Sequence, residues 1–192
     1  MDFKSSQTCQ NLLSAYAGET QANSRYQLFS KRAKSDGYMV IYNIFDLTAK
    51  NELMHADRFL GLLTFNGCPT PANISGNYPI AIGDTLANLQ ESASSEAHEY
   101  EEVYPAFAKT AEEEGFKDIA FYFNAIAQIE LDHSKTFATL AQLVSNNFFK
   151  RSEAVVWRCK ACGHTQVGTS PWQQCPVCSH PQSYAEVAGR NL

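Results

Sequence analysis

The segment IAQIELDHSKTF, residues 126–137, decides the fold that we expect for this chain. In it and just beyond it, apolar residues recur at the spacing that marks one side of an α-helix, and these are Ile126, Ile129, Phe137 and Leu140. Glu130 and His133 lie on the same side, one turn apart. A single such pair is more often an acid that reaches solvent beside a hydrogen-bonded core histidine, so its meaning depends on the other helices.

Three other segments carry acids in the same way. ELMH, residues 52–55, is a second Glu-x-x-His pair on an apolar stripe, and Glu19 and Glu96 lie singly on two further stripes. Burying four carboxylates together without cations would cost many kcal/mol, whereas two divalent metal ions remove that cost. This set of residues is that of di-iron and di-manganese helical bundles, and oxygen and imidazole ligands suit iron or manganese.

The apolar periodicity predicts four helices in the first part of the chain. The stripes cover residues 12–29, 45–62, 86–107 and about 118–144. Short turns join the first to the second and the third to the fourth, whereas residues 66–83 contain three Pro and three Gly and cannot form a helix. The pattern predicts a mainly α fold, a ferritin-like four-helix bundle with one long crossover. The similar order of acids in the two halves also indicates two related hairpins.

Several further residues lie near the predicted metal ligands. Glu99 follows Glu96 by three positions, so it either faces the metals or is solvated like its acidic neighbours. His98 lies off the stripe, and we expect it at the surface. Tyr26 and Tyr104 lie two turns beyond Glu19 and Glu96, where a phenol is either ordinary core or a partner for a metal-bound oxygen. Pro105 can also kink the third helix.

The last forty or so residues form a second kind of unit. We expect the bundle over residues 1–147, a linker over 148–152 and a small domain of strands and metal-binding turns over 153–192. This domain has little core and needs a metal to fold. Two Cys-x-x-Cys motifs predict a tetrahedral sulfur site, and their cysteines are Cys159, Cys162, Cys175 and Cys178. By itself the spacing favours structural zinc, but a di-metal bundle in the same chain favours redox-active iron.

Composition excludes several classes of partner. The 192 residues are 44% hydrophobic with a net charge of −5, and no basic cluster indicates binding to nucleic acid. We find no signal-peptide run and no membrane-spanning segment, so we expect a cytoplasmic protein that does not bind a membrane. In that compartment Cys9 and Cys68, the two cysteines outside the motifs, are predicted to be free thiols, although an antiparallel hairpin would place them at one end of the bundle.

Taken together, five segments resemble the rubrerythrin family nearly end to end. They are AYAGETQANSRY, ELMHADRF, SSEAHEYEEVYPAFA, AIAQIELDHSKTF and the C-terminal WRCKACG with PWQQCPVCSHP. The resemblance implies a ferritin-like di-iron bundle followed by a rubredoxin-like domain. It implies a non-haem iron peroxidase that reduces hydrogen peroxide to water in oxidative-stress defence. One departure is Ser179, where rubredoxin-type motifs usually have glycine after the last cysteine.

The resemblance also implies roles for the residues. The ligands of two irons would be Glu19, Glu52, His55, Glu96, Glu99, Glu130 and His133, with Glu99 and His55 exchanging at one iron on reduction. The four motif cysteines would bind a third iron, with His180 beside it. Zinc or manganese can replace iron, and Tyr26 or Tyr104 would hydrogen-bond the leaving oxygen.

The partners follow from the same resemblance. An electron-donor protein, a rubredoxin or an NAD(P)H-linked reductase, would supply the cysteine-bound iron, and a head-to-tail homodimer or larger assembly would bring that iron to a partner's bundle. Two alternatives stay open: a ferroxidase that oxidises iron for storage, and a zinc-ribbon interaction protein whose bundle metals are only structural.

Overall fold

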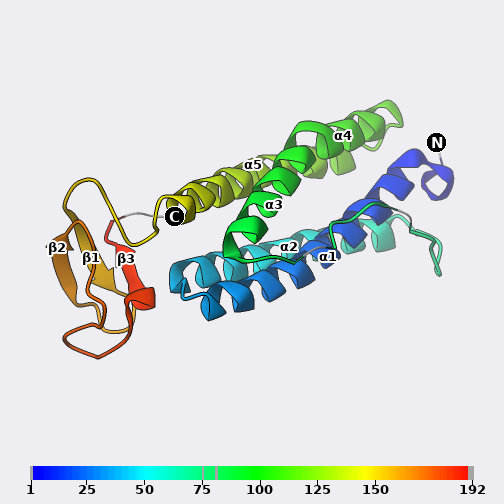
Figure 1. The fold of residues 1–192 in the computed structure, drawn as a ribbon. Helices are drawn as coiled ribbons and strands as arrows, with labels where there is room; N and C mark the ends of the chain where they lie inside the picture. Colours follow the sequence, from blue (N-terminus) through cyan, green and yellow to red (C-terminus); the bar gives the residue numbers. More distant parts are fainter. Residues whose placement is uncertain (1, 75, 81, 190–192) are drawn as a thin grey trace.

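The computed structural model describes residues 2–74, 76–80 and 82–189, and it forms a helical bundle with a small sheet at one end (Figure 1). The helices of the bundle are α1 (Gln7–Ser35), α2 (Met39–Phe65), α3 (Thr85–His98), α4 (Tyr104–Glu113) and α5 (Lys117–Ser145). Short helical turns are η1 (Phe3–Ser5), η2 (Glu99–Val103) and η3 (Gln182–Tyr184), and the strands are β1 (Val155–Cys159), β2 (Thr165–Gly168) and β3 (Ala185–Val187).

Helix α1 begins and ends beside residues that suit helix termini. Ser6 caps α1, because its hydroxyl accepts a hydrogen bond from the Cys9 N–H. Gly37 follows the helix with a φ of +88°, a conformation that glycine adopts without strain, and it turns the chain into α2. As a result α1 and α2 lie side by side and antiparallel (Figure 1).

The third predicted helix is interrupted, which the sequence periodicity did not indicate. Between α3 and α4 the turn η2 has π-helical geometry, which accommodates one extra residue, and Pro105 lies at the start of α4. At 3.6 residues per turn, Tyr104 would lie about 80° from Glu96 in a regular helix, whereas the extra residue reduces this to about 20°. Tyr104 is therefore buried, while Val103 and Phe107, apolar residues of the predicted stripe over 86–107, are only half-buried.

Helix α5 begins and ends within one residue of the predicted range. The prediction that Ile129 lies on its buried stripe is wrong. The buried side carries, at alternating steps of three and four, Ile126, Glu130, His133, Phe137 and Leu140. Ile129 is 40% exposed, because it lies about 100° around the helix from Glu130.

The core of the bundle is divided by a polar layer. One apolar cluster, at the end where the chain begins, includes Leu12, Phe59, Tyr104 and Phe123 from α1, α2, α4 and α5. The other, at the opposite end, includes Phe29, Phe45, Leu89 and Phe137 from α1, α2, α3 and α5. The acids and histidines predicted as ligands lie between the two clusters, so close-packed aromatic and aliphatic side chains keep water from both ends of the layer.

The small domain is a three-stranded antiparallel sheet in the order β2-β1-β3. Its core consists of Trp157, Trp172 and Ala185 packed against buried cysteines. The segment after α5 is tied to the bundle, since the rings of Phe148 and Phe149 pack on Tyr38 at centroid distances of 5.5 and 6.0 Å. The sheet lies beyond the turn between α1 and α2, far from the N-terminus (Figure 1). Within the described part of the chain, no helix is long and apolar enough to cross a membrane.

Candidate metal centres

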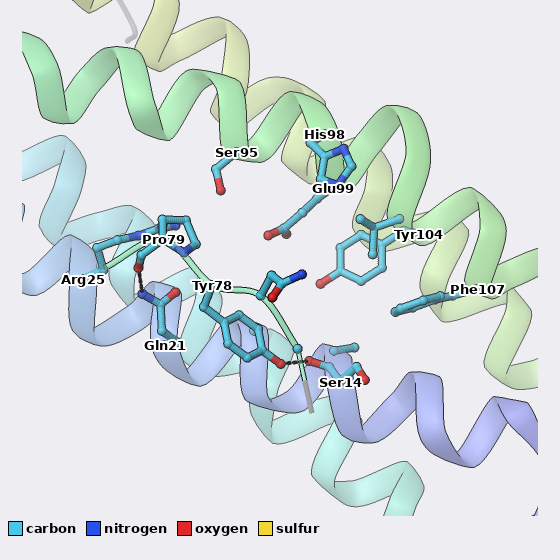
Figure 2. Close-up of a pocket in the computed structure, with 15 residues that line it drawn as sticks. Ser14, Gln21, Arg25, Tyr78, Pro79, Ser95, His98, Glu99, Tyr104 and Phe107 are labelled. Atoms are coloured by element: carbon cyan, nitrogen blue, oxygen red, sulfur yellow. Dashed lines mark hydrogen bonds between the residues drawn. The ribbon is translucent and has the colours of Figure 1, made fainter. Parts of the chain in front are cut away.

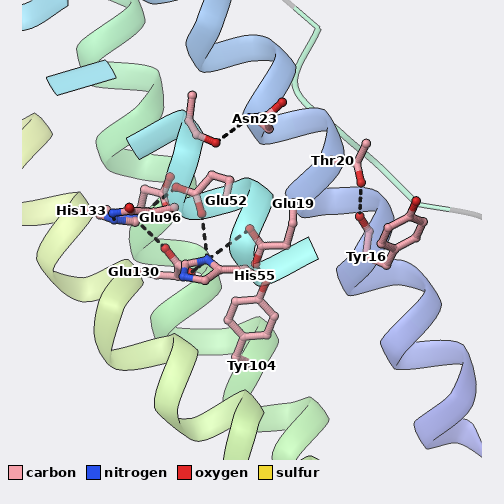
Figure 3. A network of polar contacts seen from close by, with 12 residues as sticks. Tyr16, Glu19, Thr20, Asn23, Glu52, His55, Glu96, Tyr104, Glu130 and His133 are labelled. Atoms are coloured by element: carbon pink, nitrogen blue, oxygen red, sulfur yellow. Dashed lines mark hydrogen bonds and ion pairs between the residues drawn. The ribbon is translucent and has the colours of Figure 1, made fainter. Parts of the chain in front are cut away.

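Four elements bring six of the predicted bundle ligands into two overlapping groups (Figure 3). In each group the potential ligand atoms lie within 4.8 Å of one another. One group is Glu19, Glu52, His55 and Glu130, and the other is Glu52, Glu96, Glu130 and His133. Glu52 and Glu130 belong to both groups, so each of these carboxylates could serve two metal positions.

His55 faces the first group through one ring nitrogen. Its Nδ1 lies 2.9 Å from Glu52 Oε2, 3.1 Å from Glu130 Oε1 and 3.5 Å from Glu19 Oε2. His55 follows Glu52 by three positions on α2, so both side chains emerge from the same face of the helix. The ring nitrogen is therefore directed at the point where three carboxylates meet.

His133 faces the second group in the same manner. Its Nδ1 lies 2.8 Å from Glu130 Oε2, 3.2 Å from Glu52 Oε1 and 4.0 Å from Glu96 Oε2. Its other ring nitrogen, Nε2, lies 3.2 Å from the side-chain nitrogen of Asn51. Side chains that hold the outer nitrogen of a metal-binding histidine fix the ring orientation. Asn51, which the sequence pattern did not single out, occupies that position here.

The two tyrosines hold carboxylates of opposite hairpins. The Tyr26 hydroxyl on α1 donates to Glu96 on α3, and the Tyr104 hydroxyl on α4 donates to Glu19 on α1 (Figure 3 shows the second). Both tyrosines are fully or almost fully buried. Each hairpin thus provides a tyrosine that holds a carboxylate of the other hairpin. The two hairpins are therefore similar in the residues that orient the predicted ligands as well as in the ligands themselves.

Several buried atoms of the layer fit metal ions better than hydrogen bonds. Among the described residues, both carboxylate oxygens of Glu52, Oε1 of Glu130 and Nδ1 of His55 are buried without a hydrogen-bond partner, although they lie close together. Such atoms are costly to bury unless a ligand satisfies them. Lone pairs directed at a common point are what a cation requires, so the donor set fits two divalent metals.

The acids and histidines of the layer have shifted pKa values, which determine how many protons they hold when no metal is bound. Burial, together with neighbouring carboxylates, raises the pKa of Glu19 and Glu96 well above the usual range. Burial lowers the pKa of His55 and His133, but the neighbouring carboxylates, which favour the protonated rings, outweigh it and raise the pKa to about 12 and about 9. The metal-free layer therefore keeps protons at neutral pH.

Metal loading should release those protons. A pH of 7 is below the pKa values of both His55 and His133, so both side chains are protonated. Binding two divalent ions should therefore release at least about two protons per chain. For the same reason the bundle should bind metal more weakly as the pH falls. Titration of Mn²⁺ in weak buffer measures the release, starting from protein with a filled cysteine site and an empty bundle. Metal uptake without acidification would contradict these protonation states.

Glu99 lies outside both groups and lines a cavity of about 550 Å³ (Figure 2). The cavity is lined by α1, by α3 with η2 and α4, and by the crossover residues 76–79. The carboxylate of Glu99 and the hydroxyl of Tyr104 point toward its interior. Burial raises the pKa of Glu99 to about 8, with the charges of Glu130 and Glu52 adding to the effect. Glu99 thus stands between the cavity and the metal layer, and its role as a ligand stays a prediction.

Arg25, a second residue that the sequence pattern did not single out, lines the same cavity. It is buried on α1, and its Nη1 donates to Glu91 Oε1 on α3 at 3.0 Å. Its charge acts against the rise in the pKa of Glu99. His98 also lines the cavity, but its side chain is 58% exposed, as we predicted.

The four motif cysteines meet in the small domain. Their sulfur atoms lie within 4.8 Å of one another, with 3.7 Å between Cys159 and Cys178 and between Cys162 and Cys175. A tetrahedron with metal–sulfur bonds of about 2.3 Å has edges of about 3.7 Å. The spacing therefore fits one metal ion bound by four thiolates.

The backbone around these sulfurs explains the two motifs. Burial raises the pKa of Cys175, but backbone N–H groups of Cys178 and Val177 outweigh it, and the result is a pKa of about 7. Gly163 and Ser179 occupy equivalent positions, with φ values of +79° and +60° and N–H groups that donate to Cys159 and Cys175. Ser179 thus adopts a left-handed conformation at a cost of about 1 kcal/mol, which explains why glycine is usual there.

His180 lies next to this turn. The His180 carbonyl accepts from the Cys175 N–H at 2.8 Å, and the ring packs on Tyr184 with a centroid distance of 4.5 Å. The His180 backbone is therefore hydrogen-bonded directly to Cys175, whereas a position of its imidazole beside the metal stays a prediction.

Comparisons with known proteins agree with this architecture. The rubrerythrin family model matches residues 10–141, and the model of the rubrerythrin, rubredoxin-like domain matches residues 157–186. The chain is 43% identical to rubrerythrin-1 of Clostridium acetobutylicum and 42% identical to rubrerythrin of Nitratidesulfovibrio vulgaris, over 98% of each chain.

Solved structures extend the comparison to the fold. Partially reduced nigerythrin is 27% identical, with a TM-score of 0.64 over 97% of this chain and 93% of its own. A bacterioferritin of Desulfovibrio desulfuricans, 21% identical, matches 76% of this chain and 84% of its own with a TM-score of 0.67, which shows the shared bundle fold. With a carboxylate–histidine di-metal site in a ferritin-like bundle and a four-cysteine metal site in a rubredoxin-like domain, this chain belongs to the rubrerythrin family.

Proposed function

We propose that this protein is a peroxidase that reduces hydrogen peroxide to water at the bundle site, with electrons supplied through the cysteine site. The observation that carries the proposal is the pair of four-ligand groups sharing Glu52 and Glu130, together with a cavity whose lining includes Glu99 and Tyr104. When bound, two irons in the bundle would supply two electrons and Lewis acidity, and a cysteine-bound iron would supply electrons one at a time.

The chain's own residues prepare the site for peroxide. Tyr26 and Tyr104 fix Glu96 and Glu19, so these carboxylates keep their orientation while charge in the layer changes. The apolar clusters on both sides exclude water, which strengthens electrostatic interactions inside the layer. Access would then be limited to the cavity side, where the Tyr104 oxygen, whose proton is donated to Glu19, would accept a hydrogen bond from peroxide.

Glu99 is the residue at which this proposal can be separated from a purely structural metal site. With a pKa raised to about 8, its carboxyl can carry or release a proton near neutral pH, at the boundary between the cavity and the metals. We propose that Glu99 would hold one metal in the oxidised state and that His55 would hold it in the reduced state.

Replacing this residue should therefore change reactivity more than metal content. In Glu99→Ala we expect two bundle metals to remain, because six other ligands are in place, while the ferric spectrum shifts and the peroxide rate falls by about 10- to 100-fold. Metal analysis and stopped-flow spectroscopy check this, with Glu101→Ala, an exposed acid of the same helical turn, as the control. An unchanged spectrum and rate would make Glu99 a solvated acid.

The position of the small domain suggests how electrons arrive. Along α5, His133 is about 18 Å from the end of the helix at Ser145, and the second apolar cluster lies between the two metal sites. We propose that the cysteine site of one chain serves the bundle of a partner in a head-to-tail homodimer. An external donor protein, a rubredoxin or an NAD(P)H-linked reductase, would refill it.

Steady-state assays distinguish the peroxidase from its rivals. A peroxidase consumes hydrogen peroxide in proportion to an electron donor that reduces the cysteine site. A ferroxidase instead consumes free Fe²⁺ and deposits ferric iron without needing that site. A zinc-ribbon protein would be colourless and would do neither. Donor-dependent peroxide loss supports the proposal, and iron deposition at an equal or higher rate would favour the ferroxidase.

A further inference from the structure

The two cysteines outside the metal sites lie against each other. The Sγ atoms of Cys9 and Cys68 are 3.5 Å apart, although the residues are 59 positions apart in the sequence. Both thiols are free. Cys9 is fully buried beside the first apolar cluster, and Cys68 is half-buried, so solvent reaches the pair from the side of Cys68.

Backbone hydrogen bonds fix both residues. The Cys9 N–H donates to the capping hydroxyl of Ser6 at 3.0 Å, in the first turn of α1. The Cys68 N–H donates to the Leu63 carbonyl at 2.9 Å, in the turn that ends α2. Since the two Cα positions are held and the sulfurs already touch, an S–S bond of about 2.05 Å needs only a closer approach of the two side chains.

We propose that Cys9 and Cys68 form a second, thiol-based redox site, which hydroperoxides oxidise to a disulfide. This site is separate from both metal centres and does not depend on the activity proposed for them. Its substrate class is the hydroperoxide, with hydrogen peroxide as the simplest member. Its product ties the start of α1 to the start of the crossover.

The reaction balances with one peroxide and two thiols. Cys68, the accessible thiol, attacks one peroxide oxygen as its thiolate; the O–O bond breaks, and the other oxygen leaves as water, so that Cys68 becomes a sulfenic acid. The Cys9 sulfur then attacks the Cys68 sulfur. The S–S bond forms as the S–O bond breaks, and hydroxide leaves and takes the Cys9 proton as water. Two electrons pass from two thiols to one peroxide.

The reaction is expected to be slow. Burial and contact with Cys68 raise the pKa of Cys9 to about 12, so this sulfur stays a thiol at neutral pH. The pair would therefore remain reduced while the metal sites remove peroxide, and would oxidise when peroxide stays in excess.

The alternative is that the pair is ordinary packing, because a free cysteine behaves as a small apolar residue. Peptide mapping separates the two possibilities. The metal-loaded full-length protein is reduced, freed of reductant and mixed with a tenfold excess of hydrogen peroxide without an electron donor. After a timed quench with an alkylating agent in denaturant, the cysteine state is read by mass spectrometry without reduction. Without an electron donor, the bundle metals can consume only about one equivalent of hydrogen peroxide per chain, so hydrogen peroxide remains in excess.

We expect a Cys9–Cys68 peptide in most molecules, absent before peroxide and removed by dithiothreitol. In Cys9→Ala, Cys68 should be trapped by dimedone as a sulfenic acid, whereas in Cys68→Ser the buried Cys9 should stay reduced. Oxidised wild type should also unfold at a midpoint higher by about 5 °C, reversed by reductant. Diamide, which reacts without metals, should give the same peptide. Recovery of both cysteines as alkylated thiols, or random pairing with motif cysteines, would overturn the proposal.

Discussion

Removing either shared carboxylate, by Glu52→Ala or Glu130→Ala, should empty the bundle of metal while the red colour of a ferric cysteine site remains. Both residues belong to both ligand groups, so one substitution removes a ligand from each metal position. Loss of an outer-shell partner usually costs 10- to 100-fold in metal affinity or activity, and loss of a shared direct ligand should cost more than about 100-fold in the rate with peroxide. Metal analysis and visible absorption of the same sample measure both parts.

Two control variants make this result specific. Glu101→Ala removes an exposed acid, so it should retain all metal. Glu52→Gln keeps the side-chain volume and removes only the charge, so it should also lose bundle metal. Two metals retained in Glu52→Ala or Glu130→Ala would show that these carboxylates do not bridge the ions.

The second large effect is expected in the small domain, where Cys175→Ser should abolish the red colour and steady-state turnover. Cys175 is buried, is one of four sulfurs within 4.8 Å of one another, and has a pKa lowered to about 7 that suits a thiolate ligand. Pre-reduced bundle irons already hold two electrons, so a single reaction with peroxide should survive. Stopped-flow absorbance measures that first reaction, and donor oxidation measures steady turnover.

Cys68→Ser is the matched control, because it replaces a cysteine outside both metal sites. It should keep the red colour and the steady rate. If Cys175→Ser also lost the first reaction with peroxide, the cysteine site would be doing more than relaying electrons. If it kept full steady turnover, electrons would reach the bundle by another route.

Helical periodicity predicted the metal layer because its residues occupy regular positions. Glu19, Glu52, His55, Glu130 and His133 each follow the apolar stripe of an unbroken helix, and the structure buries all of them. The cysteine site could be predicted equally well from the sequence, since two Cys-x-x-Cys motifs determine the ligand positions locally. In both metal sites, the spacing of residues along the sequence therefore indicates which side chains face the metal position.

The third helix could not be predicted as well, because a π turn depends on which carbonyl each N–H meets in the folded core. One signal was present: Tyr26 follows Glu19 by seven positions, whereas Tyr104 follows Glu96 by eight. If the two hairpins are alike, the extra residue requires a bulge between Glu96 and Tyr104, where η2 lies. The reciprocal tyrosine–glutamate bonds were not predictable either, because periodicity gives the face of a side chain and not its partner.

The contacts of Asn51 and Arg25 depend on packing between hairpins. Asn51 on α2 meets His133 on α5, and Arg25 on α1 meets Glu91 on α3. A single sequence offers no spacing rule for such pairs, since the register between two hairpins is set by the whole core. Ile129 shows the converse error, because its apolar character placed it on a stripe to which its angle around the helix does not belong.

Anaerobic stopped-flow mixing of the fully reduced, iron-loaded protein tests the central claim most directly. The reduced protein is mixed with increasing hydrogen peroxide in one experiment and with oxygen in another, and absorbance follows the bundle and the cysteine site separately. We predict that one peroxide oxidises the bundle irons of each chain, that oxygen reacts at least tenfold more slowly, and that the cysteine site loses its electron only after the bundle. Oxidation by oxygen as fast as by peroxide, or a bundle that peroxide leaves reduced, would contradict the account.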